Sequence, residues 1–294
     1  MSFTKALEGS TEDQRLLANK ADFYFYRGTA YAHSGNYERA IQDFDKALQI
    51  VPQLAEAYSN RGLACAYLED YKCAIQDYDQ AIYLDPQDAV VYYNRGLAYA
   101  YLEDYKRAIQ DFDQAIQIDP QDARFYHNRG IAYADLGDYQ SAIRDFDQTI
   151  QLNPQDAEAY GNRGLVYSRL GNHLRAIQDY DQAIYLDPRD AVAFYNRGIA
   201  YANLGDYERA IQDFDQTIQL DTQNVGAYGN RGITYADLGD YERAIQDYDQ
   251  VIEINPQDAL AYYHRGNAYQ ALGRTAEAES DFAKYKELTG EDAP

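Results

Sequence analysis

Hydrophobic and aromatic residues recur along the chain in two helical patterns that alternate within a period of 34 residues. Counted from Ala21, each unit has an aromatic residue at position 4, Gly at position 8 and Tyr at position 11, except for Cys65. A second group occupies positions 17 to 28, with Ala always at position 20 and Phe or Tyr always at position 24. Because each group falls on one face of a helix, the pattern predicts two helices per unit and an all-α fold.

Turn residues separate the predicted helices. Gly-Asp or Gly-Asn, as at Gly137 and Asp138, supplies a left-handed stop followed by an N-cap for the second helix. Glu69 and Glu103 replace this Gly in the second and third units, so we expect their turns to differ slightly. Pro at position 32 in six units ends the second helix, and an Asp such as Asp88 then caps the next helix.

The units follow one another without insertion. They tile residues 21–292 as 21–54, 55–88, 89–122, 123–156, 157–190, 191–224, 225–258 and 259–292. Residues 1–20 form a lead-in, in which Thr11, Glu12, Asp13 and Gln14 fit a capping box. We therefore expect a helix from about residue 12 that runs toward or into the first unit. Residues 293–294 remain as a short tail.

The order aromatic, Gly, aromatic, Ala, aromatic and Pro closely resembles the tetratricopeptide repeat, a helix-turn-helix unit of the same length. The resemblance covers about nine-tenths of the chain. It implies a single domain, a right-handed superhelical α-solenoid of eight units, with the first helices on its concave side. Arg at position 7 departs from the family pattern, which has Leu there.

This Arg has a regular counterpart, because position 23 is Asp in every unit. Positions 7 and 23 are equally far from the turn, so they lie side by side in an antiparallel hairpin. A guanidinium group binds a carboxylate well through two parallel hydrogen bonds. The sequence predicts eight structural ion pairs: Arg27–Asp43, Arg61–Asp77, Arg95–Asp111, Arg129–Asp145, Arg163–Asp179, Arg197–Asp213, Arg231–Asp247 and Arg265–Asp281.

A second Asp follows two residues later, as in Asp111-Phe112-Asp113. On a helix, residues i and i+2 point about 200° apart, so the two carboxylates cannot hold one metal ion. We expect the second carboxylate to be solvated.

The last unit differs from the others on its outer side. Ile at position 21, from Ile41 to Ile245, becomes Glu279, and the aliphatic residue at position 28 becomes Lys286. In earlier units these positions should pack against the following unit. Because solenoids need a polar terminal cap, we expect the array to end with the eighth unit.

Composition narrows the possible partners and the compartment. A net charge of −22 and a pI near 4.4 argue against a nucleic-acid partner and are compatible with a basic or neutral protein. No apolar run approaches the roughly 18 residues needed to span a membrane, and the N-terminus lacks a secretory signal pattern. We therefore expect a cytoplasmic protein. Cys65 and Cys73 match no metal or redox spacing and are expected to be reduced thiols.

Asn occupies position 6 in the six interior units, on the helix face opposite the hairpin core. An amide both donates and accepts hydrogen bonds, and in tetratricopeptide arrays similar ladders hold peptide backbones. The predicted peptide-binding face comprises Asn60, Asn94, Asn128, Asn162, Asn196 and Asn230, with Tyr67, Tyr93, Tyr101, Tyr195, Arg124, His127, Arg169 and aliphatic residues at position 9. Two alternatives remain open: the amides bond only between neighbouring helices, and the tyrosines pack among themselves or are solvated.

No sequence motif indicates catalysis. A phosphate-binding Gly loop, a zinc-protease helix motif and a nucleophile elbow are absent, and the four histidines lie in different units. The Lys and Arg clamp that binds chaperone tails in this family is also missing. We expect no catalytic residue, cofactor or metal.

The sequence supports two functional hypotheses. The first is a non-catalytic scaffold that binds a peptide or protein segment in its concave groove. The alternative is a structural or assembly element that self-associates through the array ends or its acidic convex face. We expect a monomer or weak self-association and no contact with nucleic acid or membrane.

Overall fold

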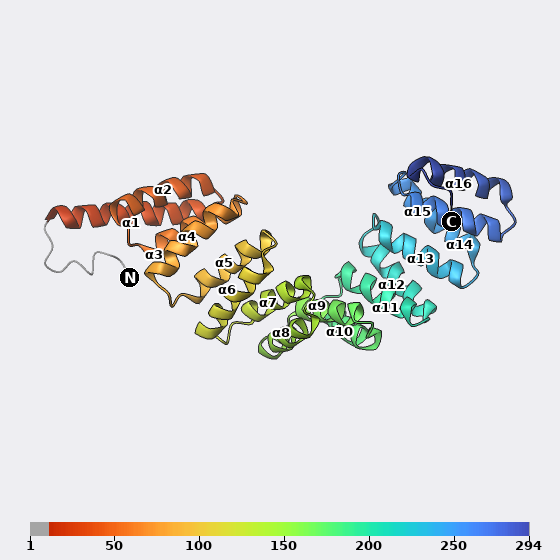
Figure 1. Cartoon of the computed structure of the whole chain (residues 1–294), viewed down its shortest axis with the longest axis horizontal. Helices are drawn as coiled ribbons and strands as arrows, with labels where there is room; N and C mark the ends of the chain where they lie inside the picture. Colours follow the sequence, from red (N-terminus) through yellow and green to blue (C-terminus); the bar gives the residue numbers. More distant parts are fainter. Residues whose placement is uncertain (1–11, 294) are drawn as a thin grey trace. The chain divides into compact units, whose positions relative to one another are not determined.

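The computed structural model describes residues 12–293, which form sixteen α-helices in consecutive pairs and no strand (Figure 1). The first helices of the pairs are α1 (Glu12–His33), α3 (Ala55–Tyr67), α5 (Ala89–Tyr101), α7 (Ala123–Leu136), α9 (Ala157–Arg169), α11 (Ala191–Asn203), α13 (Val225–Asp237) and α15 (Ala259–Ala271). The second helices are α2 (Tyr37–Ile50), α4 (Tyr71–Leu84), α6 (Tyr105–Ile118), α8 (Tyr139–Leu152), α10 (His173–Leu186), α12 (Tyr207–Leu220), α14 (Tyr241–Ile254) and α16 (Thr275–Thr289). The predicted all-α fold of helix pairs is confirmed.

The chain divides into two compact units at residues 153 and 154, the first containing α1–α8 and the second α9–α16. Within each unit, a first helix packs against the second helix of its own pair and against that of the preceding pair. The expectation that residues 21–292 form one domain stays a prediction. None of the helices in residues 12–293 combines the length and apolar character that crossing a bilayer needs.

The lead-in is part of the first helix. Helix α1 runs without interruption from Glu12 through the first half of the first repeat, so it is longer than the other first helices. Thr11, which begins the expected capping box, lies outside the described residues, as do residues 1–10. At the other end the described chain continues past α16 to residue 293.

Close helix packing explains the invariant Gly and Ala. A Cβ atom added at Gly96 would lie 2.7 Å from the Cε1 atom of Phe112, so only Gly lets the two helices approach this closely. Ala108 and Phe112 are fully buried in the same cluster. Between pairs, Ile41 of α2 packs against the buried cluster that contains Tyr78 of α4. Each pair therefore buries one apolar face within itself and another against its neighbour.

The turns are alike in all pairs, including those without Gly. Gly137 has a φ of +86°, and Glu69 and Glu103 adopt the same left-handed region at +60° and +59°. The residue after each also donates its N–H to a carbonyl of the preceding helix, at 2.9 Å for Asp138 and 3.0 Å for Asp70. The expectation of a different turn was wrong, because the helix-ending hydrogen bonds fix the backbone and the Glu must follow it.

This strain gives a first prediction. A left-handed conformation costs a residue with a side chain about 1–2 kcal/mol, whereas Gly loses about 0.5–1 kcal/mol through its freedom in the unfolded chain. Glu69→Gly and Glu103→Gly should therefore each raise the free energy of unfolding by about 0.5–1 kcal/mol, measured by urea denaturation.

Gly137→Ala is the matched control, because nothing lies within 4 Å of its added Cβ and only the φ angle is affected. It should lower the free energy of unfolding by about 1 kcal/mol. A Glu69→Gly protein that is less stable than wild type would contradict this account.

Candidate functional site

In each helix pair, a bidentate Arg–Asp ion pair joins the two helices. In the third pair, Arg95 on α5 donates from Nε to Asp111 Oδ2 at 2.8 Å and from Nη2 to Oδ1 at 2.7 Å. The same contact occurs at Arg27–Asp43, Arg61–Asp77, Arg129–Asp145, Arg163–Asp179, Arg197–Asp213, Arg231–Asp247 and Arg265–Asp281. All eight sequence-predicted partners are therefore in contact.

The third guanidinium nitrogen reaches the preceding pair. Arg95 Nη1 donates to Asp79 Oδ1 at 2.5 Å, and Asp79 is the second Asp of its own pair's Asp-Tyr-Asp segment. The equivalent bonds are Arg61–Asp45, Arg129–Asp113, Arg197–Asp181, Arg231–Asp215 and Arg265–Asp249. These six aspartates are about half exposed, so they remain partly solvated as expected, but stacking also brings the next guanidinium beside each of them, a contact that was not predicted. We call this repeated Asp–Arg–Asp contact the arginine ladder.

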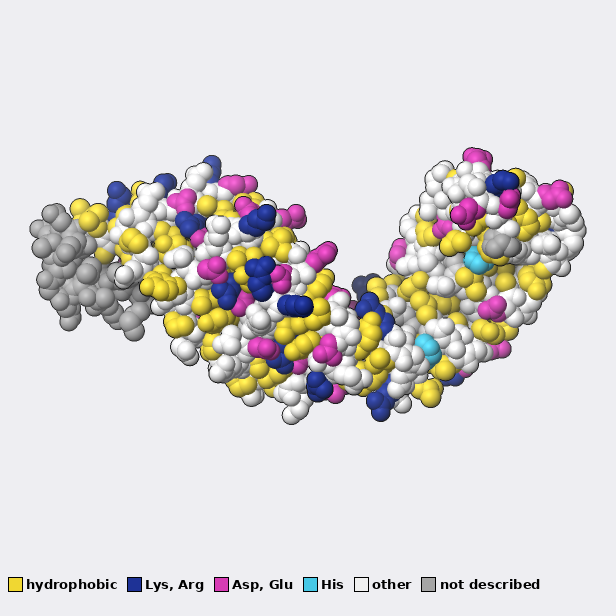
Figure 2. Space-filling model, in the orientation of Figure 1, with side chains coloured by type: hydrophobic (Ala, Val, Ile, Leu, Met, Phe, Trp, Pro, Cys, Tyr) yellow, Lys and Arg dark blue, Asp and Glu magenta, His cyan; other side chains and the backbone are white. Residues whose placement is uncertain are grey.

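Burial governs the electrostatics of the ladder. Burial raises the pKa of Asp111, and the hydrogen bonds from Arg95 oppose this effect without cancelling it. In the first pair, where Arg27 is more exposed, its hydrogen bond instead lowers the pKa of Asp43. Because buried ion pairs lose much of their attraction to desolvation, the ladder adds less net stability than its number of hydrogen bonds suggests. Figure 2 shows basic and acidic side chains intermixed on the visible face of residues 12–153.

Three equivalent hollows lie along residues 12–153, each between one helix pair and the first helix of the next. Their volumes are about 280, 260 and 190 Å³. Phe44, Tyr78 and Phe112 at position 24 line the three hollows in turn. The predicted amides Asn60, Asn94 and Asn128 contribute one residue to each, together with the aliphatic residues Leu63, Leu97 and Ile131. The structure thus brings these predicted residues together at regular intervals.

Stacked tyrosines separate neighbouring hollows. The rings of Tyr37 and Tyr67 lie 4.6 Å apart and those of Tyr71 and Tyr101 lie 4.9 Å apart, both within 8° of parallel. Tyr67 lines the first and second hollows, and Tyr101 lines the second and third. Both side chains are exposed. Each stack offers an aromatic wall to a ligand in either adjoining hollow.

Two of the predicted amides already bond between helices. Asn128 Nδ2 donates to Tyr93 Oη at 3.1 Å and to a backbone oxygen, and Asn230 Nδ2 donates to Tyr195 Oη at 2.9 Å. Burial raises the pKa of both tyrosines, so their hydroxyls stay neutral and can accept these bonds. At these two positions the amides bond between neighbouring helices, which was the stated alternative to binding a peptide backbone. By contrast, Asn60 and Asn94 are half-buried and make no side-chain hydrogen bond to another described residue.

The remaining predicted residues do not join the three hollows. Arg124 forms an ion pair with Asp122 at 2.5 Å, and Arg169 is exposed in the last turn of α9. His127 is only 8 % exposed and its ring lies 5.9 Å from that of Phe146. It therefore lies in the hairpin core and not on the groove surface, because position 5 faces the buried aromatic of the second helix. Asn162 and Asn196 are half-buried on α9 and α11.

In residues 154–293 a hollow of about 190 Å³ lies between α13, α14 and α15. Gly226 and Gly229 line it: nothing lies within 4 Å of a Cβ added at Gly229, whereas a Cβ added at Gly226 would lie 2.8 Å from Tyr195 Oη. Asn230 and His264, both at position 6, also line it. Burial lowers the pKa of His264, so its ring is neutral at physiological pH. This hollow was not among the sequence predictions. The sequence feature that could have indicated it is the pair of glycines at positions 2 and 5 of this repeat.

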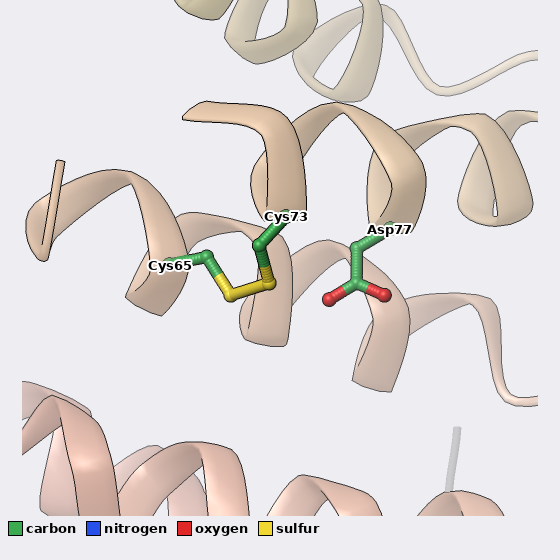
Figure 3. A group of neighbouring side chains, drawn as sticks. All are labelled: Cys65, Cys73 and Asp77. Carbon is green, nitrogen blue, oxygen red and sulfur yellow. A yellow bond between two sulfur atoms is a disulfide. The ribbon is translucent and has the colours of Figure 1, made fainter. Parts of the chain in front are cut away.

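Cys65 and Cys73 are joined in a disulfide bond between α3 and α4 (Figure 3). The expectation of reduced thiols was wrong: positions 11 and 19 face each other across the hairpin, with Cα atoms 5.9 Å apart, a usual disulfide separation. Asp77 lies beside them, and potential ligand atoms of the three residues are within 4.8 Å of one another. The bonded sulfurs are not thiolates, however, and Asp77 accepts two hydrogen bonds from Arg61. The disulfide is also more typical of oxidising compartments than of the cytosol assumed from sequence.

The ladder predicts unequal effects of two aspartates on the same arginine. Asp145→Asn removes the buried partner of Arg129 and should lower the free energy of unfolding by about 3–5 kcal/mol. Asp113→Asn removes the half-exposed partner and should cost about 0.2–1 kcal/mol. Urea denaturation of both variants provides the measurement, and equal effects would exclude this division of roles.

The disulfide predicts a redox-dependent stability. A bond that closes a loop of eight residues stabilises by about 2–3 kcal/mol in the chain-entropy description. Dithiothreitol should therefore lower the free energy of unfolding of the wild type by this amount. A Cys65→Ser/Cys73→Ser protein should show the same loss and no further response to the reductant. Equal stability of the reduced and oxidised wild type would count against the bond's contribution.

Comparison with known proteins agrees with this architecture. Family models described as TPR repeat match residues 28–67, 63–102 and 234–273. Models described as tetratricopeptide repeat match residues 89–122, 127–191, 167–228 and 259–292. No curated protein sequence matches the chain.

Several solved structures are similar. MamA is 29% identical with a TM-score of 0.54, over 55% of this chain and 94% of that one. YrrB, described as a TPR protein with an unusual peptide-binding site, is 26% identical with a TM-score of 0.56, over 64% of this chain and 97% of that one. A C-terminal part of a TPR repeat-containing protein from Cytophaga hutchinsonii, 18% identical over 83% of this chain and 97% of that one, shares the fold with a TM-score of 0.67. Given these family matches and its sixteen paired helices, the chain belongs to the tetratricopeptide repeat family.

Proposed function

We propose that this protein is a non-catalytic interaction scaffold that binds an extended segment of another protein along the three hollows of residues 12–153. Membership of the tetratricopeptide repeat family supports a protein-interaction role. The observation that carries the more specific proposal is the regular recurrence of the hollows, each with an aromatic floor, a tyrosine wall and an amide.

The hollows contain amides that can bind the backbone of a ligand and apolar residues that can bind its side chains. Asn60 and Asn94 can donate to a carbonyl and accept from an N–H of a bound backbone, because neither amide is engaged with another described residue. The aromatic and aliphatic lining accepts apolar side chains of the same segment. Within these three hollows we therefore assign backbone recognition to Asn60 and Asn94, since both N–H groups of Asn128 already have acceptors.

Charge further restricts the ligand. A chain with a net charge of −22 attracts basic segments, repels acidic ones and is compatible with neutral ones. We therefore propose a ligand with apolar side chains at intervals and a neutral or positive net charge. YrrB, with its peptide-binding site, provides a precedent within the family at 26% identity.

Selection from a random peptide library on the immobilised protein tests this function. Recovered peptides should be rich in apolar residues, and Tyr67→Ser/Tyr101→Ser should weaken their binding at least about tenfold, measured by calorimetry. Asn60→Ala/Asn94→Ala should also weaken binding without changing which apolar side chains are preferred.

Tyr83→Ser/Tyr185→Ser is the control, because it removes two exposed tyrosines that line none of these hollows. It should leave affinity unchanged, and circular dichroism should show equal helix content in all variants. Peptides that bind the Tyr67→Ser/Tyr101→Ser protein as tightly as the wild type would refute the proposed groove.

A further inference from the structure

Helix α1 lies at the N-terminal end of residues 12–153 (Figure 1). It exposes several large apolar side chains. Leu16 is 68 %, Leu17 52 %, Phe23 54 % and Tyr26 57 % exposed. Leu16, Phe23 and Tyr26 are separated by seven and then three residues and share one helix face, whereas Leu17 lies on the opposite side of the helix from Tyr26. We call Leu16, Phe23 and Tyr26 the α1 face. An apolar patch of this kind on a protein surface is typical of an interaction site.

The equivalent residues of the later first helices indicate which kind of contact the α1 face can make. Phe23 occupies position 3, through which later first helices pack onto the preceding pair. Residues at this position are buried in later pairs of residues 12–153 and of residues 154–293, namely Ala57, Val91, Phe125, Ala193, Ala227 and Ala261. At α1 no described pair precedes, yet the position carries a large aromatic residue and not a polar one. The α1 face thus has the character of a helix-packing surface without a partner among the described residues.

The opposite end of the repeat array has the opposite chemistry. On α16, Glu279 and Lys286 are exposed at positions where earlier second helices carry Ile or Leu. An α16 docked on the α1 face of another copy would remove these two charges from water without providing partners for them, which is costly. Head-to-tail stacking of copies is therefore disfavoured, and like-to-like contact of two α1 faces is not.

Charge also favours α1 as the meeting point of two copies. The chain as a whole carries −22, so two copies repel each other over most of their surface. Helix α1 is formally neutral, with three acidic residues (Glu12, Asp13, Asp22) and three basic residues (Arg15, Lys20, Arg27). A two-fold contact between identical apolar faces closes on itself and produces a dimer, not a filament.

We propose that the α1 face is the contact surface between two copies of this chain. The partner is a second α1, packed face to face about a two-fold axis. Three side chains from each copy make a small interface, so the dimer is weak, with a dissociation constant in the range of about 1–100 µM. Helix α1 lines the first hollow only from Thr29 onward, so the dimer leaves the hollows open and carries two binding grooves. This inference does not depend on the proposed function.

Sedimentation equilibrium of the full chain over a range of concentrations tests the proposal. The wild type should change from monomer to dimer, with no larger species. Phe23→Glu and Tyr26→Glu should each raise the dissociation constant at least about tenfold, because two negative charges would meet across the axis. Added salt should strengthen the wild-type dimer, since it screens the repulsion between acidic chains.

Tyr83→Glu on α4 is the matched control, because it places the same charge at a tyrosine that is 81 % exposed outside the α1 face. It should leave the dissociation constant unchanged, and circular dichroism should confirm that all variants remain helical. Deletion of residues 1–11 should preserve the dimer.

Three results would overturn the proposal: a wild type that stays monomeric at every concentration, a dimer that persists in both glutamate variants, or a dimer that is lost when residues 1–11 are removed. Peptide binding by monomeric Phe23→Glu protein should equal that of the wild type, so failure of the dimer and failure of the groove can be distinguished.

Discussion

The arrangement of this molecule depends on an arginine held between two aspartates. In the third pair, Arg95 uses two nitrogens to bind Asp111 of its own hairpin and a third to bind Asp79 of the preceding one. One planar cation therefore sets both the alignment within a pair and the alignment between pairs. A leucine at the same position could fill the space but could not fix direction, because apolar contact is not directional.

This alignment determines what the surface can present. With consecutive pairs held in register within residues 12–153, equivalent residues of each pair return to equivalent places, and the same hollow appears three times. Residue differences between the pairs then determine whether the Asn of each hollow already has a hydrogen-bond partner. Asn128 is engaged by Tyr93, whereas Asn60 and Asn94, whose preceding pairs have Phe25 and Ser59 at the same position, are not.

Departures from the repeat concentrate in places with distinct physical properties. In the second pair Cys65 and Cys73 replace a residue pair that in five other pairs brings an arginine over a tyrosine, as Arg107 lies 4.6 Å from the ring centre of Tyr99. A covalent link thus replaces a cation–π contact at the same two positions of the hairpin. The first and last helices differ in another respect: α16 is charged on its outer side, whereas α1 is apolar.

The sequence by itself determined the helix pairs, their boundaries near the turn residues, the family and the partners of the eight arginines. These features repeat with a fixed period and depend on contacts within one hairpin, so spacing along the chain is enough to predict them. Contacts between hairpins could not be predicted in this way. The second bond of Arg95 to Asp79, the engagement of Asn128 and the burial of His127 depend on the angle and depth at which neighbouring helices pack. The left-handed Glu69 and the Cys65–Cys73 bond were also settled only by the folded hairpin, because backbone hydrogen bonds and side-chain proximity there override the preferences of the isolated residues.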